Sequence, residues 1–265
     1  MGKIVAISNQ KGGVGKTTTA INLAASLALA DQRILLVDMD PQGNLTSGLG
    51  MKQFTQDGPT VYDTLMAEGG ESIPEIPTSV DRLYIAPANR NLAGAEIELV
   101  NLTNRESRLR TALASVRERY DFILIDTPPS LGLLTLNALV AADAVLIPLH
   151  CEYFALEGIA DLVATLKRVR SALNPRLDIQ GVLLTMYDDR TNLGQQVARD
   201  IRGFFQEKVF ETVIPRNVRL GEAPSHGMPV VLYDVKSRGT EAYLALAREL
   251  LERERAAQSP VTTTK

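Results

Sequence analysis

A glycine-rich stretch with two lysines carries the strongest chemical signal in this chain. It spans residues 8–18 and reads Ser-Asn-Gln-Lys-Gly-Gly-Val-Gly-Lys-Thr-Thr. Its glycines allow sharp turns, so that successive backbone N–H groups can point inward at phosphate oxygens. We therefore expect Lys16 to reach the β- and γ-phosphates of a nucleoside triphosphate and the Thr17 hydroxyl to bind Mg²⁺.

The flanking residues provide the context that a phosphate-binding loop requires. An apolar run at residues 4–7 predicts a strand before the loop, and helix formers at residues 20–28 predict a helix after it. That helix would direct the positive end of its dipole at the phosphates. The residues expected to bind the nucleotide are Gly12, Gly13, Val14, Gly15, Lys16, Thr17 and Thr18.

Aspartates follow two further apolar runs. Asp38 and Asp40 come after the run at residues 35–37, and Asp126 ends the run at residues 122–125. Open parallel sheets bind ligands at the carboxyl ends of their strands, so these carboxylates should lie near the phosphates. A continuous apolar strand that ends in aspartate is typical of a carboxylate on the Mg²⁺ side of such a site. We therefore predict that Asp126 and Thr17 share the metal.

The remaining pattern predicts an α/β fold, a doubly wound and mostly parallel sheet with helices on both faces. Further strands are expected at residues 82–87, 144–148 and 181–186, and one more ending at 213–219. Helices are expected at residues 61–67, 92–102, 107–119, 133–142, 155–173, 193–207 and 240–255. We expect one domain over residues 1–255 and a disordered polar tail at 256–265.

Composition limits the possible functions. The chain has 265 residues, a net charge of −3 and a pI near 5.6, so any contact with nucleic acid must come from a local basic patch. One cysteine cannot form an internal disulfide, which suits a reducing cytoplasm. We expect no secretory signal and no membrane-spanning segment.

The loop departs from the common P-loop pattern at one position. The pattern G-x-x-x-x-G-K-[ST] requires glycine where this chain has Gln10, and a second lysine, Lys11, follows. Residues 11–17 thereby resemble the deviant Walker A motif of the ParA/MinD family of ATPases. The resemblance covers nearly the whole chain and is greatest for the chromosomal ParA/Soj branch.

This resemblance implies roles for individual residues. Asp40 matches the family's aspartate associated with hydrolysis, and Asp38 matches a carboxylate on the metal side. Glu152 matches a position near the nucleotide at a dimer interface. Pro215 and Asn217 match the positions that hold the adenine. Lys11 would reach the phosphates of a second subunit, so that Lys11, Lys16 and Asp40 are the residues expected to act in hydrolysis.

The resemblance also implies partners. An ATP-bound homodimer would bind double-stranded DNA without sequence preference, and a ParB-type centromere-binding protein would stimulate hydrolysis and release the DNA. The protein would then be cytoplasmic and associated with the nucleoid. The loops that match the family's basic surface, with two further candidates, carry Arg190, Arg216, Arg219, Lys236 and Arg238. Without the resemblance, solvated surface charge would be the better interpretation of these residues, because residues 190–238 hold eight Lys/Arg against five Asp/Glu.

Other branches and classes make different demands on the residues. MinD-type proteins end in a basic amphipathic helix, whereas residues 259–265 have no apolar face, so we expect no membrane binding. The nitrogenase iron protein needs paired cysteines for its cluster. Larger plasmid partition ATPases carry an N-terminal DNA-reading domain, which we do not expect here. An ATP-dependent metabolic enzyme such as an amidoligase, and a nucleotide-gated scaffold without hydrolysis, remain as alternatives of a different class.

Overall fold

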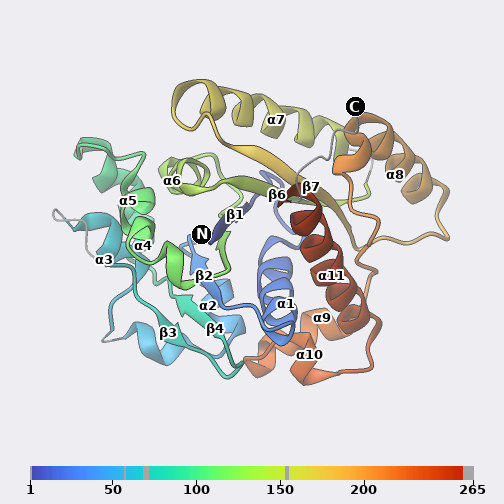
Figure 1. The fold of residues 1–265 in the computed structure, drawn as a ribbon, viewed down its shortest axis with the longest axis horizontal. Helices are drawn as coiled ribbons and strands as arrows, with labels where there is room; N and C mark the ends of the chain where they lie inside the picture. Colours follow the sequence, from blue (N-terminus) through green and yellow to red (C-terminus); the bar gives the residue numbers. More distant parts are fainter. Residues whose placement is uncertain (1, 57, 68–71, 153–154, 259–265) are drawn as a thin grey trace, which may run out of the picture.

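One sheet forms the centre of the molecule (Figure 1). The computed structural model describes residues 2–56, 58–67, 72–152 and 155–258. Within these residues the sheet has seven strands in the order β3-β4-β2-β5-β1-β6-β7. Their bounds are β1 Lys3–Ile7, β2 Ile34–Asp38, β3 Ile76–Pro77, β4 Leu83–Ala86, β5 Phe122–Asp126, β6 Ala144–His150 and β7 Asp178–Thr185. Every neighbouring pair is parallel except β3 with β4. The predicted doubly wound, mostly parallel sheet is confirmed.

Two layers of helices bury the sheet. One layer packs α1 and α11 on one face, and Figure 1 shows α6 and α7 on the opposite side of the central strands. The first layer comprises α1 Lys16–Leu29, α2 Asn44–Gly48, α9 Val218–Glu222, α10 Val230–Tyr233 and α11 Arg238–Gln258. The second comprises α3 Val61–Met66, α4 Leu92–Glu98, α5 Arg108–Ala114, α6 Leu133–Ala141, α7 Ala155–Ala172 and α8 Asn192–Phe205. Strands covered on both faces can be apolar throughout, which explains the continuous runs in the sequence.

The strand order places the candidate site at the end of the sheet where the parallel strands have their carboxyl ends. We call this end the carboxyl edge, and the opposite end the amino edge. Strand β1 lies between β5 and β6, and the glycine-rich loop leaves its carboxyl end. Ile7 and Asp38 both lie in register with Asp126 on β5. The loop and two of the predicted carboxylates are therefore brought together by strand pairing, although more than 80 residues separate Asp38 from Asp126 in the sequence.

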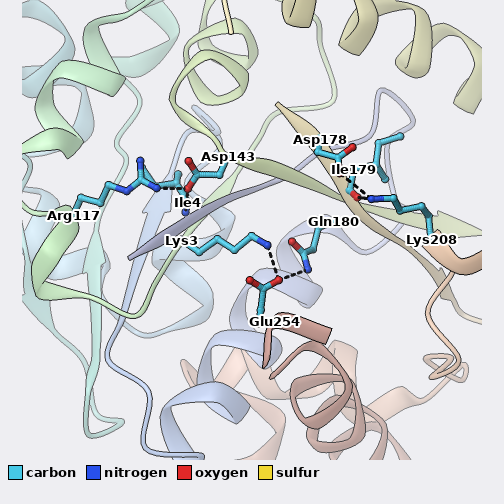
Figure 2. Close-up of polar contacts among 9 residues, drawn as sticks. All are labelled: Lys3, Ile4, Arg117, Asp143, Asp178, Ile179, Gln180, Lys208 and Glu254. Atoms are coloured by element: carbon cyan, nitrogen blue, oxygen red, sulfur yellow. Dashed lines mark hydrogen bonds and ion pairs between the residues drawn. The ribbon is translucent and has the colours of Figure 1, made fainter. Parts of the chain in front are cut away.

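The opposite, amino edge of the sheet is fastened by polar contacts (Figure 2). Glu254 near the end of α11 accepts hydrogen bonds from Lys3 of β1 and from Gln180 of β7, at 2.5 and 2.8 Å. Farther along this edge, Asp143 accepts from the Ile4 backbone N–H at 2.8 Å and pairs with Arg117 at 2.6 Å. These contacts join elements that are distant in sequence. We refer to this group, together with the Lys208–Asp178 ion pair, as the amino-edge pairs.

The structure differs from the sequence prediction in several segments. No strand ends at residues 213–219 in the described chain; an isolated bridge joins Pro215 to Tyr187, and α9 begins at Val218. Pro215 has no N–H with which to extend a ladder. The antiparallel strand β3 was not predicted. The last helix continues to Gln258, three residues into the predicted tail, and residues 259–265 lie outside the described residues. Among the described helices, none is both long and apolar enough to cross a bilayer.

Candidate nucleotide-binding site

The glycine-rich loop adopts a backbone that its glycines permit. Gly13 and Gly15 have φ values of +71° and +86°, a region that residues with a side chain rarely occupy. Helix α1 begins directly afterwards at Lys16. The Thr185 hydroxyl, at the end of β7, donates to the Val14 carbonyl at 2.8 Å and so holds the loop against the sheet. The loop therefore presents a helix N-terminus and turned backbone at a fixed place, as a phosphate site requires.

A cavity of about 820 Å³ lies against this loop. Its loop side is formed by Gly12, Gly13, Gly15, Lys16, Thr17 and Thr18. Asp40 also lines the cavity, at 8% exposure. A volume of this size is within the ~300–1,000 Å³ range of small-molecule sites. Val14, which was also predicted to bind the nucleotide, does not line the described cavity. It is buried, at 2% exposure, and its carbonyl accepts the hydrogen bond from Thr185 that holds the loop.

Lys16 is poised for a negatively charged ligand. Its side chain folds back over the loop, and Nζ donates to the Lys11 carbonyl at 3.2 Å. Burial lowers the pKa of Lys16, against the opposing attraction of Asp126 and Asp40. Desolvation disfavours the charged form of a buried amine, so a bound phosphate would restore the interaction that water gives elsewhere.

Asp126 and Thr17 form the centre of a potential metal site. The Thr17 hydroxyl donates to Asp126 Oδ2 at 2.7 Å, whereas the buried Asp126 Oδ1 has no hydrogen-bond partner. Complete burial, then the nearby charge of Asp38, raises the pKa of Asp126 well above its usual range. Within the described chain there is no cluster of three or more His, Cys, Asp or Glu for a metal. The donors present fit Mg²⁺, which is usually held by one or two protein oxygens together with substrate phosphates and water.

Asp38 lies beside this pair but makes contacts of a different kind. Its Oδ2 accepts from the Thr46 backbone at 2.9 Å and from the Thr46 hydroxyl at 2.7 Å. Its Oδ1 accepts from the Asp40 backbone at 3.1 Å. Burial raises the pKa of Asp38 to about 6 in spite of these hydrogen bonds. Thus Asp38 fixes the loop that carries Asp40, and both of its oxygens are occupied by protein donors.

Lys11 is oriented away from the cavity formed by its own loop. Its Nζ lies 2.6 Å from Glu152 Oε2, and the two side chains are 36% and 48% exposed. His150 Nδ1 lies 2.7 Å from the other Glu152 oxygen. Lys11 is absent from the described residues that line the cavity. The two lysines of the loop thus face different directions, Lys16 inward and Lys11 outward.

The opposite side of the cavity is built from the chain after β7. Pro215 and Asn217, both predicted, line it together with Arg216. Asn217 Oδ1 accepts from the Arg219 backbone at 2.8 Å and so caps α9. Sequence reasoning missed a further set of lining residues: Met186, Leu220, Gly221, Pro224, Ser225 and Tyr243. No local pattern marks these residues, because the fold alone brings α9 and α11 to the loop.

The residues predicted to contact DNA are all exposed: Arg190, Arg216, Arg219, Lys236 and Arg238. Two of them are engaged by carboxylates. Arg190 donates twice to Asp188, at 2.8 and 2.7 Å. Arg219 pairs with Glu222 at 2.7 Å and with Asp234 at 3.1 Å. Such exposed pairs are weak and exchange readily with solvent or another anion.

Comparisons with known proteins identify the family of this chain. A family model described as "AAA domain" matches residues 2–179. The chain is 59% identical over 256 residues to the "Chromosome partitioning protein ParA" of Myxococcus xanthus, covering 96% of this chain and 89% of that one. It is 57% identical over 250 residues to the "Sporulation initiation inhibitor protein Soj" of Bacillus subtilis, covering 94% and 98%. The chain belongs to the ParA/Soj family of chromosome-partitioning ATPases.

A solved structure extends the comparison to ligands. The cobyrinic acid a,c-diamide synthase of Mycobacterium smegmatis, with bound ATP analogue and magnesium, is 36% identical, with a TM-score of 0.84 and coverage of 97% and 98% of the two chains. Membership of the ParA/Soj family, together with such neighbours, assigns ATPase activity with ATP and Mg²⁺ as ligands. In this chain Asp126 Oδ1 has no hydrogen-bond partner, and the Thr17 hydroxyl lies beside the other oxygen of the same carboxylate.

Proposed function

We propose that ATP joins two copies of this chain face to face, and that Lys11 of each copy contacts the phosphates bound by the other. The outward direction of Lys11 is the observation that carries this proposal. Its ammonium group is held at the surface by Glu152, at 2.6 Å, outside its own cavity. A lysine supplied by a second subunit would offset charge that develops on the phosphates during transfer, the task that an arginine finger performs elsewhere.

Within one subunit we assign the other roles as follows. Thr17 and Asp126 hold Mg²⁺, which neutralises charge on the phosphates when bound. Lys16 binds the phosphates from inside the cavity, and Asp40 orients the attacking water. Asp38 positions Asp40 through its backbone N–H, at 3.1 Å. Pro215 and Asn217 contact the adenine, which their place on the cavity supports.

The nucleotide-bound dimer would bind double-stranded DNA through the exposed basic residues. Asp234 joins two of these residues: it pairs with the Arg219 guanidinium group at 3.1 Å and accepts from the Lys236 backbone N–H at 3.2 Å. Phosphates would replace Asp234 and Asp188 as partners. Contacts to the phosphates of the DNA backbone carry no sequence preference, and DNA binding should weaken steeply as salt is added.

The cycle closes when a ParB-type centromere-binding protein stimulates hydrolysis. Loss of the γ-phosphate removes the link between the two lysines of opposite subunits, the dimer opens, and the DNA is released. Repeated on the nucleoid, this cycle would drive segregation of replicated DNA. The names of the relatives at 59% and 54% identity, both chromosome partitioning proteins, support partition as the purpose of the ATPase.

A second candidate follows from the neighbour of different name. An amide-forming enzyme would use the same ATP site and would need a pocket for a carboxylic acid beside the γ-phosphate. Such an enzyme hydrolyses ATP in step with its acid and amine substrates, whereas a partition ATPase responds to DNA and a protein partner. The two functions therefore differ in what stimulates ATP hydrolysis: acid and amine substrates in one case, DNA and a protein partner in the other.

ATPase rates measured alone, with non-specific DNA, and with DNA plus a ParB-type protein distinguish these functions. We expect a low rate alone and the highest rate with both additions, with the Lys16→Ala variant as the background. A rate that ignores DNA and partner but rises with a carboxylic acid and ammonia would favour the amide-forming enzyme. ATP binding without turnover under all conditions would favour a nucleotide-gated scaffold.

A further inference from the structure

A second cavity lies at the amino edge of the sheet, at the end opposite the nucleotide. It has a volume of about 330 Å³ and is bordered by the start of β1, the α6–β6 junction, α5 and the turn after α7. Three arginines line it: Arg110 on α5, Arg117 in the turn that follows, and Arg176 after α7. Among the described lining residues, Asp143 is the one carboxylate. The cavity is therefore strongly basic in a chain with a net charge of −3.

The charge of Asp143 is already matched within the protein (Figure 2). Arg117 pairs with it at 2.6 Å and also donates from Nε to the Gly2 carbonyl at 2.8 Å. Asp143 further accepts from the Ile4 backbone at 2.8 Å. By contrast, no hydrogen bond or ion pair joins Arg110 or Arg176 to any residue in the described ranges. Two guanidinium groups at this cavity thus lack a protein anion.

Part of the cavity wall is apolar and held in place. Ile4 and Val140 are buried, at 3% and 2% exposure, and form part of the lining. Asn174 fixes the end of α6, because its Nδ2 donates to the carbonyls of Leu139, Val140 and Ala142 at 3.0, 3.2 and 2.7 Å. Asn174 itself is buried at 8% exposure. A ligand would meet a preformed surface, which reduces the entropy lost on binding.

We propose that this cavity binds a small organic dianion, with its charged head on Arg110 and Arg176 and a short apolar body against Ile4 and Val140. Guanidinium groups bind planar carboxylates and phosphates through paired, charge-assisted hydrogen bonds. The volume, less than half of the 820 Å³ of the nucleotide cavity, favours a ligand smaller than a nucleoside triphosphate. A phosphate monoester and a dicarboxylate share this chemistry.

Calorimetric titration of the whole chain tests the proposal, with ADP and Mg²⁺ at saturation so that the nucleotide site is filled. The probes are phenyl phosphate, phthalate and the uncharged benzyl alcohol. We expect one site per chain for at least one of the two dianions, weakening with added salt, and no binding of the alcohol. Tighter binding of phenyl phosphate assigns a phosphate monoester, and tighter binding of phthalate assigns a dicarboxylate.

Substitutions locate the binding. Arg110→Gln and Arg176→Gln should each weaken the dianion about tenfold, the usual effect of removing one charge-assisted hydrogen bond. Arg168→Gln, on the exposed side of α7, is the matched control and should change nothing. Unchanged ADP affinity in each variant shows that the fold is intact. Absence of binding at millimolar probe, or binding that persists in the double variant of Arg110 and Arg176, would overturn the proposal.

Discussion

The two edges of the sheet treat charge in opposite ways. At the carboxyl edge, Asp126 is buried with one oxygen unpartnered. Burial there raises the pKa of Asp38 and lowers the pKa of Lys16, and both shifts favour the neutral form of the side chain. At the amino edge, Glu254 is matched by Lys3, and Asp143 by Arg117.

The difference indicates which edge is built for a ligand. A buried carboxylate without a matching charge costs free energy, and it persists where a ligand supplies the missing partner. We propose that Mg²⁺ is that partner for Asp126 and that the triphosphate is the partner for Lys16. The charged groups of the amino-edge pairs are matched within the chain, and they fasten α11 and β1. The arginine-lined cavity is the exception at that edge, because two of its arginines have no anionic partner in the described chain.

The largest effect is expected from exchanging one lysine at each edge. Lys16→Ala should weaken ATP binding about a thousandfold, because it removes one member of a buried, charge-assisted contact with phosphate. Lys3→Ala removes a lysine of the same strand–loop unit whose partner is Glu254. It should leave ATP affinity unchanged. Calorimetric titration with ATP and Mg²⁺ measures both, and equal affinities in the two variants would remove Lys16 from the site.

The next effect is a dependence of stability on pH at the carboxyl edge. The folded pKa of Asp38 is about 6, above its ordinary value of 3.8, so the folded state holds this proton more tightly than the unfolded chain. The free-energy cost of ionising the buried Asp38 carboxyl is absent below about pH 4, where the group is protonated in both the folded and the unfolded state. It is complete above about pH 6, where the group is ionised in both. In protein free of nucleotide and metal, the stability of the native chain relative to Asp38→Asn should therefore fall by about 3 kcal/mol from pH 4 to pH 7.

Denaturant titrations of both proteins at several pH values measure this difference. A native-to-variant difference for Asp38 that stays constant, or grows with rising pH, would contradict the account.

Matched amide substitutions should change stability in opposite directions at the two edges. Asp126→Asn removes a buried charge and should stabilise the ligand-free protein by about 1–2 kcal/mol while abolishing Mg²⁺-dependent hydrolysis. Asp143→Asn removes the charge that faces Arg117 and should destabilise it by about 1 kcal/mol without loss of hydrolysis. Thermal unfolding and ATPase assays on the two variants provide the measurement. Destabilisation by both substitutions would show that the edges do not differ.

The smallest effect is expected at Glu254. Glu254→Gln keeps a hydrogen-bond acceptor for Gln180 but loses the ion pair with Lys3, whose side chain is 28% exposed. Partly exposed pairs contribute about 1 kcal/mol or less, so the midpoint of unfolding should shift only slightly. A loss of several kcal/mol would mean that the amino-edge pairs hold the fold together more strongly than their exposure indicates.

Local sequence patterns were sufficient for the fold class and for placing the glycine-rich loop beside Asp38 and Asp126. An apolar run that ends in aspartate identifies both a buried strand and the edge at which it ends, which is why Asp38, Asp126 and the loop could be placed together. The same rule failed at residues 213–219. Val213 and Ile214 are apolar, but Pro215 cannot donate to a ladder, and the chain turns into α9 after a single bridge.

Features that depend on distant residues could not be predicted. Tyr243 reaches the cavity from α11, more than 200 residues after the loop, and its hydroxyl meets Thr19 at 3.2 Å. The Lys3–Glu254 pair spans 251 residues. The Lys11–Glu152 pair, which spans 141 residues, was likewise not predicted. Each of these needed the packed structure, because no short pattern encodes it.

If Lys11 of one copy completes the nucleotide site of another, ATP must join two chains. Sedimentation velocity of the Asp40→Ala variant, in which hydrolysis is expected to be blocked, measures this. With saturating ATP and Mg²⁺ we expect a species of twice the chain mass, and a return to single chains when Lys11→Ala is added. Single chains in the Asp40→Ala variant under the same conditions would show that ATP does not join two copies.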